Sequence, residues 1–333
     1  GHYDVQPPEP LELWDSPPFE PEIRNGRLYG RGTGDNKGQL LTHILAIRAY
    51  LKVFGSVPIN IKFIFEGDEE IGSYPLEQFA KANKELLSAD LVYTSDGAME
   101  AGDIPILSFG VRGVMNFDLI LKTATMDNHS GNKGGVIINA AWEMVKVLSS
   151  MKDSEGRVLV EGFYDDLVRP TDYELKLIDN LSYDPVKLAS AFGVDNITLE
   201  KKEYFTRLMF QPTLTINGLR SGHLGEGSKN IIPGYAVAKM EIRLAYDQNP
   251  QKLIECIRNH VKRVNPDVEV VQLESDMLPS KTYAGLPVAQ VVSKAVSKVS
   301  NKPPLVFPST GGSLPDYIWT KILGIPSVLV PYA

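Results

Sequence analysis

Five carboxylates and one imidazole near the start of the chain could together hold metal ions. Packing so many anions around one point is costly unless cations neutralise them. Oxygen and imidazole ligands suit zinc, manganese or cobalt, whereas thiolates would indicate a different kind of site. The six residues are His2, Asp4, Asp35, Glu69, Glu70 and Asp96.

The spacing of these residues allows them different tasks. His2 and Asp4 are two apart on an expected strand end, so their side chains share a face and Asp4 can support the imidazole. Of the adjacent Glu69 and Glu70, one can bind metal while the other moves a proton. Taken alone, however, an acidic pair is most often a solvated surface. Spacing by itself therefore leaves a metal site and an acidic surface both open.

The elements predicted around these residues favour the metal site. Residues 37–54 carry apolar side chains at helical spacing, and 76–87 form a second helix. Residues 58–65 and 89–94 are apolar strands, and each runs into acidic residues. Ligands of such α/β folds bind beyond the carboxyl ends of the strands, where the acidic residues stand.

The middle of the chain follows a different pattern, and its end returns to the first one. Residues 235–244 alternate between apolar and polar types, as a half-buried antiparallel strand does. We therefore predict an α/β, mixed-sheet catalytic domain built from residues 1–111 and 282–333, with an inserted α+β domain at 112–281. Other elements predicted are strands at 116–122, 211–217 and 326–330 and helices at 140–151, 252–264 and 288–299.

Composition excludes some classes of protein. The 333 residues carry a net charge of -7, which disfavours nucleic-acid binding. The longest apolar runs are too short and too interrupted by Pro and Gly to cross a membrane. The single cysteine, Cys256, rules out an internal disulfide and fits a cytoplasmic protein. The chain starts at Gly1 within a strand-like segment and stops in another, so we expect a segment truncated at both ends.

An ordered series of motifs resembles the M20 metallopeptidase family, and most closely its carnosinase-like, cytosolic dipeptidase branch (M20/M25/M40). The resemblance spans essentially the whole chain, and its specificity comes from the order of the motifs. The motifs are GHYDVQP, WDSPPFEP, GRLYGRGTGDNKG, FEGDEEIGS, SDG, DNHSG, GEGSKNIIP, EIRL and GGSLP.

The resemblance implies a zinc-peptidase-like fold and a role for each residue of the cluster. His2 and Asp96 would bind one divalent ion and Glu70 the other, with Asp35 bridging the two. Zinc is expected first, with manganese or cobalt as alternatives. Glu69 would be general base and acid for a metal-bridging hydroxide, and Asp4 would orient His2. The family often has a cis peptide after the bridging aspartate, here between Asp35 and Asn36.

The resemblance also implies roles for residues outside the cluster. The insertion would serve as lid and dimerisation domain of a homodimer. His129 would stabilise the oxyanion of the substrate in the partner subunit. Arg243 would hold the carboxylate of a peptide substrate, helped by Asn230 and Ser313. The family's last metal ligand, a histidine, would lie beyond Ala333.

Three functions follow, of which the first is the leading hypothesis and the other two are alternatives. The first is hydrolysis of a peptide bond in dipeptides or short peptides by a dipeptidase or exopeptidase. The second keeps the chemistry but changes the substrate to an N-acyl amino acid, as in a deacylase or desuccinylase. The third is a non-catalytic binding protein on the same fold.

Overall fold

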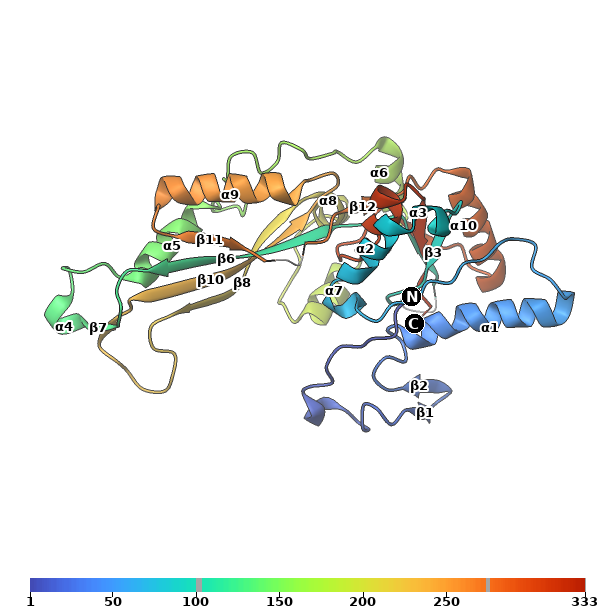
Figure 1. Cartoon of the computed structure of the whole chain (residues 1–333), viewed down its shortest axis with the longest axis horizontal. Helices are drawn as coiled ribbons and strands as arrows, with labels where there is room; N and C mark the ends of the chain where they lie inside the picture. Colours follow the sequence, from blue (N-terminus) through green and yellow to red (C-terminus); the bar gives the residue numbers. More distant parts are fainter. Residues whose placement is uncertain (100–103, 274–275, 333) are drawn as a thin grey trace. The chain divides into compact units, whose positions relative to one another are not determined.

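The computed structural model describes residues 1–99, 104–273 and 276–332. The chain divides into two compact units. The first unit contains residues 1–111, 170–209 and 280–333, and the second contains 112–169 and 210–279. Figure 1 shows the elements of both units.

A four-stranded mixed sheet organises the first unit. Its order is β13–β4–β14–β3; β13 is parallel to β4, β14 is parallel to β3, and β14 runs antiparallel to β4. Leu107, Val328 and Val330 are buried beside Ala289 and Val292 of helix α10 (Pro287–Ser300). This packing gives the unit its own hydrophobic core. The strands are β3 (Val92–Thr94), β4 (Ile106–Ser108), β13 (Leu305–Phe307) and β14 (Ser327–Leu329).

Helices of the first unit begin and end close to the predicted limits. Helix α1 (Lys37–Phe54) ends at Gly55, whose positive φ of 75° is the left-handed conformation that glycine adopts most readily. The helix predicted at 76–87 is two helices, α2 (Tyr74–Ala82) and α3 (Lys84–Leu87), separated at Asn83. Further helices of this unit are η1 (Leu11–Leu13), η2 (Glu69–Ile71), α10 (Pro287–Ser300) and the π-helix η3 (Ile318–Ile322).

The prediction of a strand at 58–65 is wrong. These residues form no strand with any described part of the chain, and the β-pairing next to them is one parallel bridge between His2 and Glu66. Ile59 and Phe63 are 68% and 45% exposed, so the apolar pattern that predicted a buried strand lies on the surface of this chain. A strand needs a partner in register as well as an apolar pattern.

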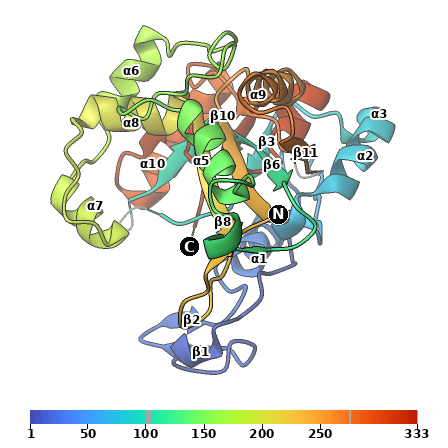
Figure 2. The ribbon, with the colours of Figure 1, turned by 90° about the vertical axis from the view of Figure 1, so that its left-hand side faces the viewer.

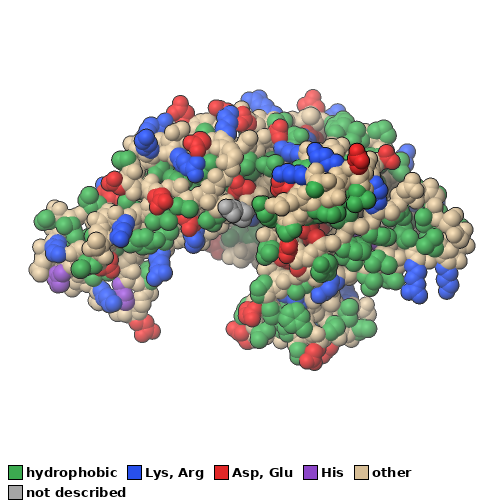
Figure 3. Space-filling view, viewed as in Figure 1, with side chains coloured by type: hydrophobic (Ala, Val, Ile, Leu, Met, Phe, Trp, Pro, Cys, Tyr) green, Lys and Arg blue, Asp and Glu red, His purple; other side chains and the backbone are tan. Residues whose placement is uncertain are grey.

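A separate lobe of the first unit carries the hairpin of β1 (Glu22–Arg24) and β2 (Arg27–Tyr29). Leu13 and Ile23 are 78% and 77% exposed there. Figure 3 shows apolar and acidic side chains gathered on this lobe. The chain runs from β2 directly to Asp35, so an irregular segment positions this residue of the acidic cluster.

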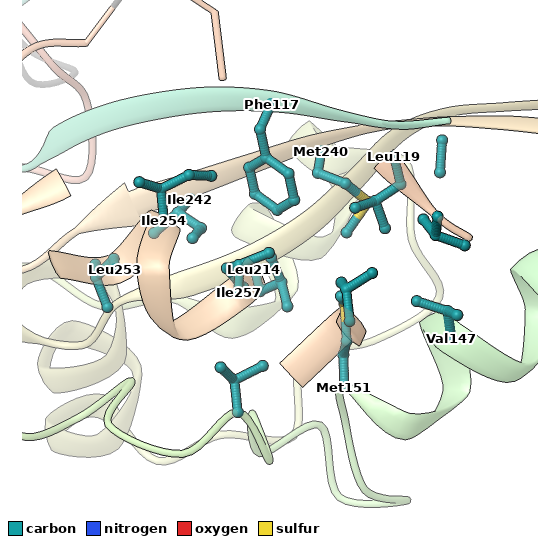
Figure 4. Packing of buried hydrophobic residues seen from close by; sticks show 14 of the residues in the cluster. Phe117, Leu119, Val147, Met151, Leu214, Met240, Ile242, Leu253, Ile254 and Ile257 are labelled. Carbon is teal, nitrogen blue, oxygen red and sulfur yellow. The ribbon is translucent and has the colours of Figure 1, made fainter. Parts of the chain in front are cut away.

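The second unit is built on an antiparallel sheet with strand order β11–β6–β10–β8. One face is apolar and packs against α5 (Ala140–Ser150) and α9 (Pro250–Val264); Figure 4 shows this core, including Phe117, Met240 and Ile257. Because strand side chains alternate, the intervening residues point to the other face, where Lys239 of β10 and Asp118 of β6 form an ion pair. The strands are β6 (Gly113–Lys122), β8 (Thr213–Ser221), β10 (Tyr235–Leu244) and β11 (Glu269–Gln272).

A smaller ladder completes the second unit. Strands β7 (Asn128–His129) and β9 (Ile231–Ile232) pair antiparallel, and helix α4 (Ser130–Lys133) follows β7 directly. Figure 2 shows α4 and α5 of this unit from the side.

Residues 170–209 differ from the prediction, which placed them inside an unbroken insertion at 112–281. They form three helices that group with the first unit, apart from the last residue of the third. Glu174 is ion-paired with Lys281 of β12 (Ser280–Lys281), which pairs with β5 (Gly110–Val111). These long-range contacts are invisible in the sequence pattern. The helices are α6 (Asp172–Asp179), α7 (Pro185–Phe192) and α8 (Lys201–Phe210).

His260 of α9 is a buried polar residue of the second unit. It is only 7% exposed, and its Nε2 lies 2.9 Å from Ser150 Oγ of α5. Among the described residues, no helix combines the length and apolar character needed to cross a membrane.

Candidate metal centre

His2 is held in place by Asn36 and Asp4. It is 2% exposed, and its backbone N–H donates to Asn36 Oδ1 (3.3 Å). Its Nδ1 lies 3.1 Å from Asp4 Oδ1, and the second oxygen of Asp4 accepts from the backbone N–H of Glu70 (3.0 Å). With Nδ1 engaged by a carboxylate, Nε2 is the ring atom left to bind a ligand. The carboxylate of Asp4 therefore contacts both the His2 ring and the backbone of Glu70.

Asp35 and Asn36 form the second corner of the site. The peptide bond between them is cis, as the family resemblance led us to expect. Asn36 is fully buried, and its Nδ2 donates to Ser95 O (2.5 Å). Asn36 thus joins the segment of His2 to the loop that carries Asp96, and the sequence analysis gave it no such task.

Gln39 is a second buried amide that sequence reasoning missed. Its Nε2 donates to Gly34 O (2.8 Å) and Gly97 O (2.9 Å), and its Oε1 accepts from Tyr332 N (2.7 Å). A buried amide that uses its oxygen and its nitrogen in this way fixes the backbone segments around it. The sequence carried no distinct signal for it, because Gln39 is one of several polar residues in α1.

Glu69 and Glu70 follow one another in η2, but their surroundings differ. The side chain of Glu69 is 14% exposed, and its Oε2 lies 4.0 Å from His2 Nε2. Glu70 Oε2 accepts a hydrogen bond from Gln6 Nε2 (2.8 Å). The two side chains therefore face different groups, as two different roles would require.

The structure brings three of the predicted ligands into one group. The ligand atoms of His2, Asp35 and Asp96 all lie within 4.8 Å of one another. His2 Nε2 is 2.9 Å from Asp35 Oδ1 and 3.6 Å from Asp96 Oδ2. No hydrogen bond of normal geometry reaches this buried nitrogen within the described chain. A ring nitrogen aimed at two carboxylates is the donor set that a divalent cation fits.

The electrostatics of the cluster support this fit. Burial lowers the pKa of His2, but the carboxylates of Asp96, Glu69 and Asp35 outweigh it and raise the pKa to about 9. Burial, followed by the charge of Asp96, raises the pKa of Glu69 to about 7. Without a metal ion the cluster therefore retains protons, and a bound cation would replace them.

Other predicted residues lie outside this group. His129, Asn230 and Arg243 belong to the second unit, on or beside β7, β9 and β10. Ser313 is half-buried in the first unit, in the loop after β13. A pocket of about 50 Å³ adjoins His2, Glu69 and Asp96 and is lined further by Leu314 and Trp319.

His129 has a defined hydrogen-bonding state. It is exposed, and its Nδ1 accepts from Gly131 N (3.1 Å). A neutral imidazole that accepts at Nδ1 carries its proton on Nε2. The ring therefore presents an N–H donor, the group needed beside a developing oxyanion.

Arg243 has a carboxylate partner within its own strand. Its Nε and Nη2 donate to the two oxygens of Glu241 at 2.9 and 3.1 Å. Such a two-pronged pair holds the guanidinium in one orientation.

Known proteins are similar to this chain throughout its length. A rat protein named Beta-Ala-His dipeptidase is 33% identical over 267 residues, which are 79% of this chain and 54% of that protein. The chain thus spans about half the length of the mammalian dipeptidases that it matches. A Candida albicans protein named Cys-Gly metallodipeptidase DUG1 is 31% identical over 99% of this chain and 70% of its own length.

Solved structures are similar as well. The M20 family metallo-carboxypeptidase Sso-CP2 from Sulfolobus solfataricus has a TM-score of 0.92 and 34% identity, over 98% of this chain and 75% of that one. The dipeptidase Dug1p from Saccharomyces cerevisiae has a TM-score of 0.83 and 27% identity, over 99% and 71%. The model of peptidase family M20/M25/M40 matches residues 1–330, and the chain therefore belongs to this family.

Proposed function

We propose that this protein is a dinuclear metallopeptidase that hydrolyses dipeptides or short peptides. The observation that carries the proposal is the group formed by buried His2 with Asp35 and Asp96, beside Glu69. The names of the relatives, Beta-Ala-His dipeptidase and Cys-Gly metallodipeptidase, support a peptide substrate over an N-acyl amino acid.

The residues divide into ligands and proton carriers. His2, Asp96, Asp35 and Glu70 would hold two divalent ions, with zinc as the first expectation. Such ions lower the pKa of a water and polarise the carbonyl to be attacked. Asp4 keeps the His2 ring in its orientation through the contact at Nδ1.

Glu69 takes the proton of the attacking water and delivers it to the leaving amine. It suits this task because it is mostly buried, lies within reach of the cluster and is not a member of the three-residue group. Burial and neighbouring carboxylates make its carboxylate a stronger base than an exposed glutamate.

The second unit would complete the reaction from a partner subunit. We infer a homodimer in which the Nε2–H of His129 stabilises the oxyanion in the other subunit. Arg243, with Asn230 and Ser313, would bind the carboxylate of the substrate. A cytoplasmic location belongs to the same proposal.

The substitution Glu69→Gln tests the central role. We expect it to lower kcat by about 100- to 10,000-fold, since general-base catalysis contributes that much. Bound metal, measured by elemental analysis, should stay at the wild-type level. The control is Glu85→Gln, which removes an exposed carboxylate of α3 from the same unit. A Glu69→Gln enzyme with near-normal kcat would rule out the assignment.

A further inference from the structure

Helix α1 buries an amide side chain and leaves leucines at the surface. The structure describes every residue of α1, and Gln39 is the only one of them that is buried, at 3% exposed. Leu41 and Leu45 of the same helix are 49% and 47% exposed. Burial of an amide is unfavourable unless its polar atoms have partners, so the partners of Gln39 indicate its role.

The two acceptors of the Gln39 amide nitrogen each stand next to a predicted metal ligand. Nε2 donates to Gly34 O (2.8 Å), and Gly34 immediately precedes Asp35. The same nitrogen donates to Gly97 O (2.9 Å), and Gly97 immediately follows Asp96. One nitrogen with two protons therefore holds the backbone beside both ligands.

Gly97 extends this restraint to the carboxylate of Asp96. Its N–H donates to Asp96 Oδ1 (2.6 Å), while its C=O accepts from Gln39. The other oxygen, Asp96 Oδ2, lies 3.6 Å from His2 Nε2. Hydrogen bonds and one glycine thus connect Gln39 with the carboxylate that faces the imidazole.

Asp35 depends more strongly on its backbone for its position. Its side chain is 64% exposed, against 13% for Asp96, so neighbouring side chains restrain it less. Asn36, the residue after Asp35, donates from Nδ2 to the carbonyl of Ser95, the residue before Asp96 (2.5 Å). The backbone on both sides of Asp35 is therefore joined to the backbone on both sides of Asp96.

A third partner engages the remaining polar atom of Gln39. Its Oε1 accepts from the backbone N–H of Tyr332 (2.7 Å), which follows β14. Figure 1 shows the start of α1 next to this end of the chain. With both N–H groups and the oxygen bonded, the Gln39 side chain is held in one orientation.

We propose that Gln39 is a positioning residue of the metal centre, which sets the separation of Asp35 and Asp96 before an ion binds. The proposal rests on the metallopeptidase function proposed above. Two carboxylates directed at one point repel each other, so loops without this connection would separate in the absence of an ion. A pair of ligands that is already in place binds an ion more tightly, because the loops lose no further freedom on binding.

The test measures the affinity of the protein for Zn²⁺ by titration against a competing chelator, which requires no turnover. Gln39→Met keeps the length of the side chain and removes its hydrogen bonds. We expect the affinity to fall by about 10- to 100-fold, the effect typical of residues that orient metal ligands. Because every ligand is still present, saturating Zn²⁺ should return kcat to near the wild-type value.

The matched control is Gln248→Met in the second unit. Gln248 is 2% exposed, its Nε2 donates to Phe163 O (2.7 Å), and its Oε1 accepts from Ala245 N (2.9 Å). Both substitutions should lower the free energy of unfolding in urea, since each removes a buried, bonded amide. Of the two, Gln39→Met alone should lower the affinity for Zn²⁺.

A second variant covers the case in which Gln39→Met does not fold. Gln39→Glu keeps the oxygen that accepts from Tyr332 N and has at most one proton to donate, so it loses at least one of the two bonds to the ligand loops. We expect its affinity for Zn²⁺ to fall by about 3- to 10-fold, as the loss of one hydrogen bond predicts.

The outcomes separate this inference from the proposed function. A folded Gln39→Met or Gln39→Glu protein with wild-type affinity for Zn²⁺ would overturn the role of Gln39. Equal losses of affinity in Gln39→Met and Gln248→Met, or a kcat that stays low at saturating Zn²⁺, would overturn it as well. In these cases the peptidase function still stands if the wild-type protein binds Zn²⁺ and hydrolyses dipeptides. If the wild-type protein does neither, the peptidase function itself fails.

Discussion

The ion pair between Glu174 and Lys281 should be worth far more to stability than the ion pairs on the surface. Glu174 Oε1 lies 2.5 Å from Lys281 Nζ, and the side chains are 3% and 16% exposed. Its other oxygen accepts from Thr171 N (2.7 Å) and Thr171 Oγ1 (2.9 Å) at the start of α6. The pair ties the segment 170–209 to β12 of the same unit.

Glu174→Gln removes the charge, keeps the shape and leaves Lys281 beside a neutral partner. Breaking a buried pair on one side costs about 3–5 kcal/mol, because the remaining charge has lost its compensation. The loss of a charge-assisted cap at α6 falls within this range. We therefore expect a fall of about 3 kcal/mol in the free energy of unfolding of the first unit.

The assay is urea unfolding followed by tryptophan fluorescence, since Trp14 and Trp319 lie in the first unit. The control is Glu203→Gln, because Glu203 and Arg207 form a pair in α8 whose side chains are 49% and 52% exposed. An exposed helical pair contributes about 0.5 kcal/mol or less. A double variant, Glu174→Gln with Lys281→Met, should recover part of the loss. Equal effects of Glu174→Gln and Glu203→Gln would refute the reasoning from burial.

Three further predictions follow from the site and the second unit. Asp4→Asn should weaken metal binding by about 10- to 100-fold, because it disturbs both His2 Nδ1 and the backbone of Glu70; a competitive chelator titration measures this, and an unchanged affinity would remove Asp4 from the supporting role. Mixing inactive His129→Ala and Glu69→Gln subunits should restore about a quarter of wild-type activity, since half of randomly formed dimers are mixed and each has one intact site; no recovery would mean that His129 does not act across the dimer. Burial and the charge of Arg263 lower the pKa of His260 below its usual 6.5, so the unfolded state binds more protons, and the second unit should lose stability as the pH falls through about 6.5. Hydrogen exchange of α9 at pH 7.5 and 5.5 checks this, and a His260→Gln protein with the same pH dependence would contradict it.

Much of the second unit could be predicted from local pattern. Strand β10 has the predicted limits, and α9 begins within two residues of its predicted start, because each has one apolar face that its period reveals. The residues of the candidate metal centre were predictable for another reason. Spacing alone left an acidic surface open as well, but the order of the motifs along the chain matches a known family.

Residues 170–209 and the unpaired segment 58–65 could not be predicted in the same way. The structure of each segment depends on contacts with residues distant in the sequence, such as the ion pair between Glu174 and Lys281. Local apolar pattern reports which face of an element is buried but not which element buries it.

The sequence by itself determined which groups could bind metal and move protons, because their chemistry is a property of residue type. Tertiary structure decided how these groups are held. In the folded chain, His2 Nε2 lies near the carboxylates of Asp35 and Asp96, and Asp4 contacts the other ring nitrogen. The buried amides of Asn36 and Gln39 join the loops around this group. Tertiary structure also brought Arg112 Nη1 within hydrogen-bond distance of Gln211 O. Distances of a few ångströms between residues far apart in the chain arise only from packing, and they turn a list of ligands into a site.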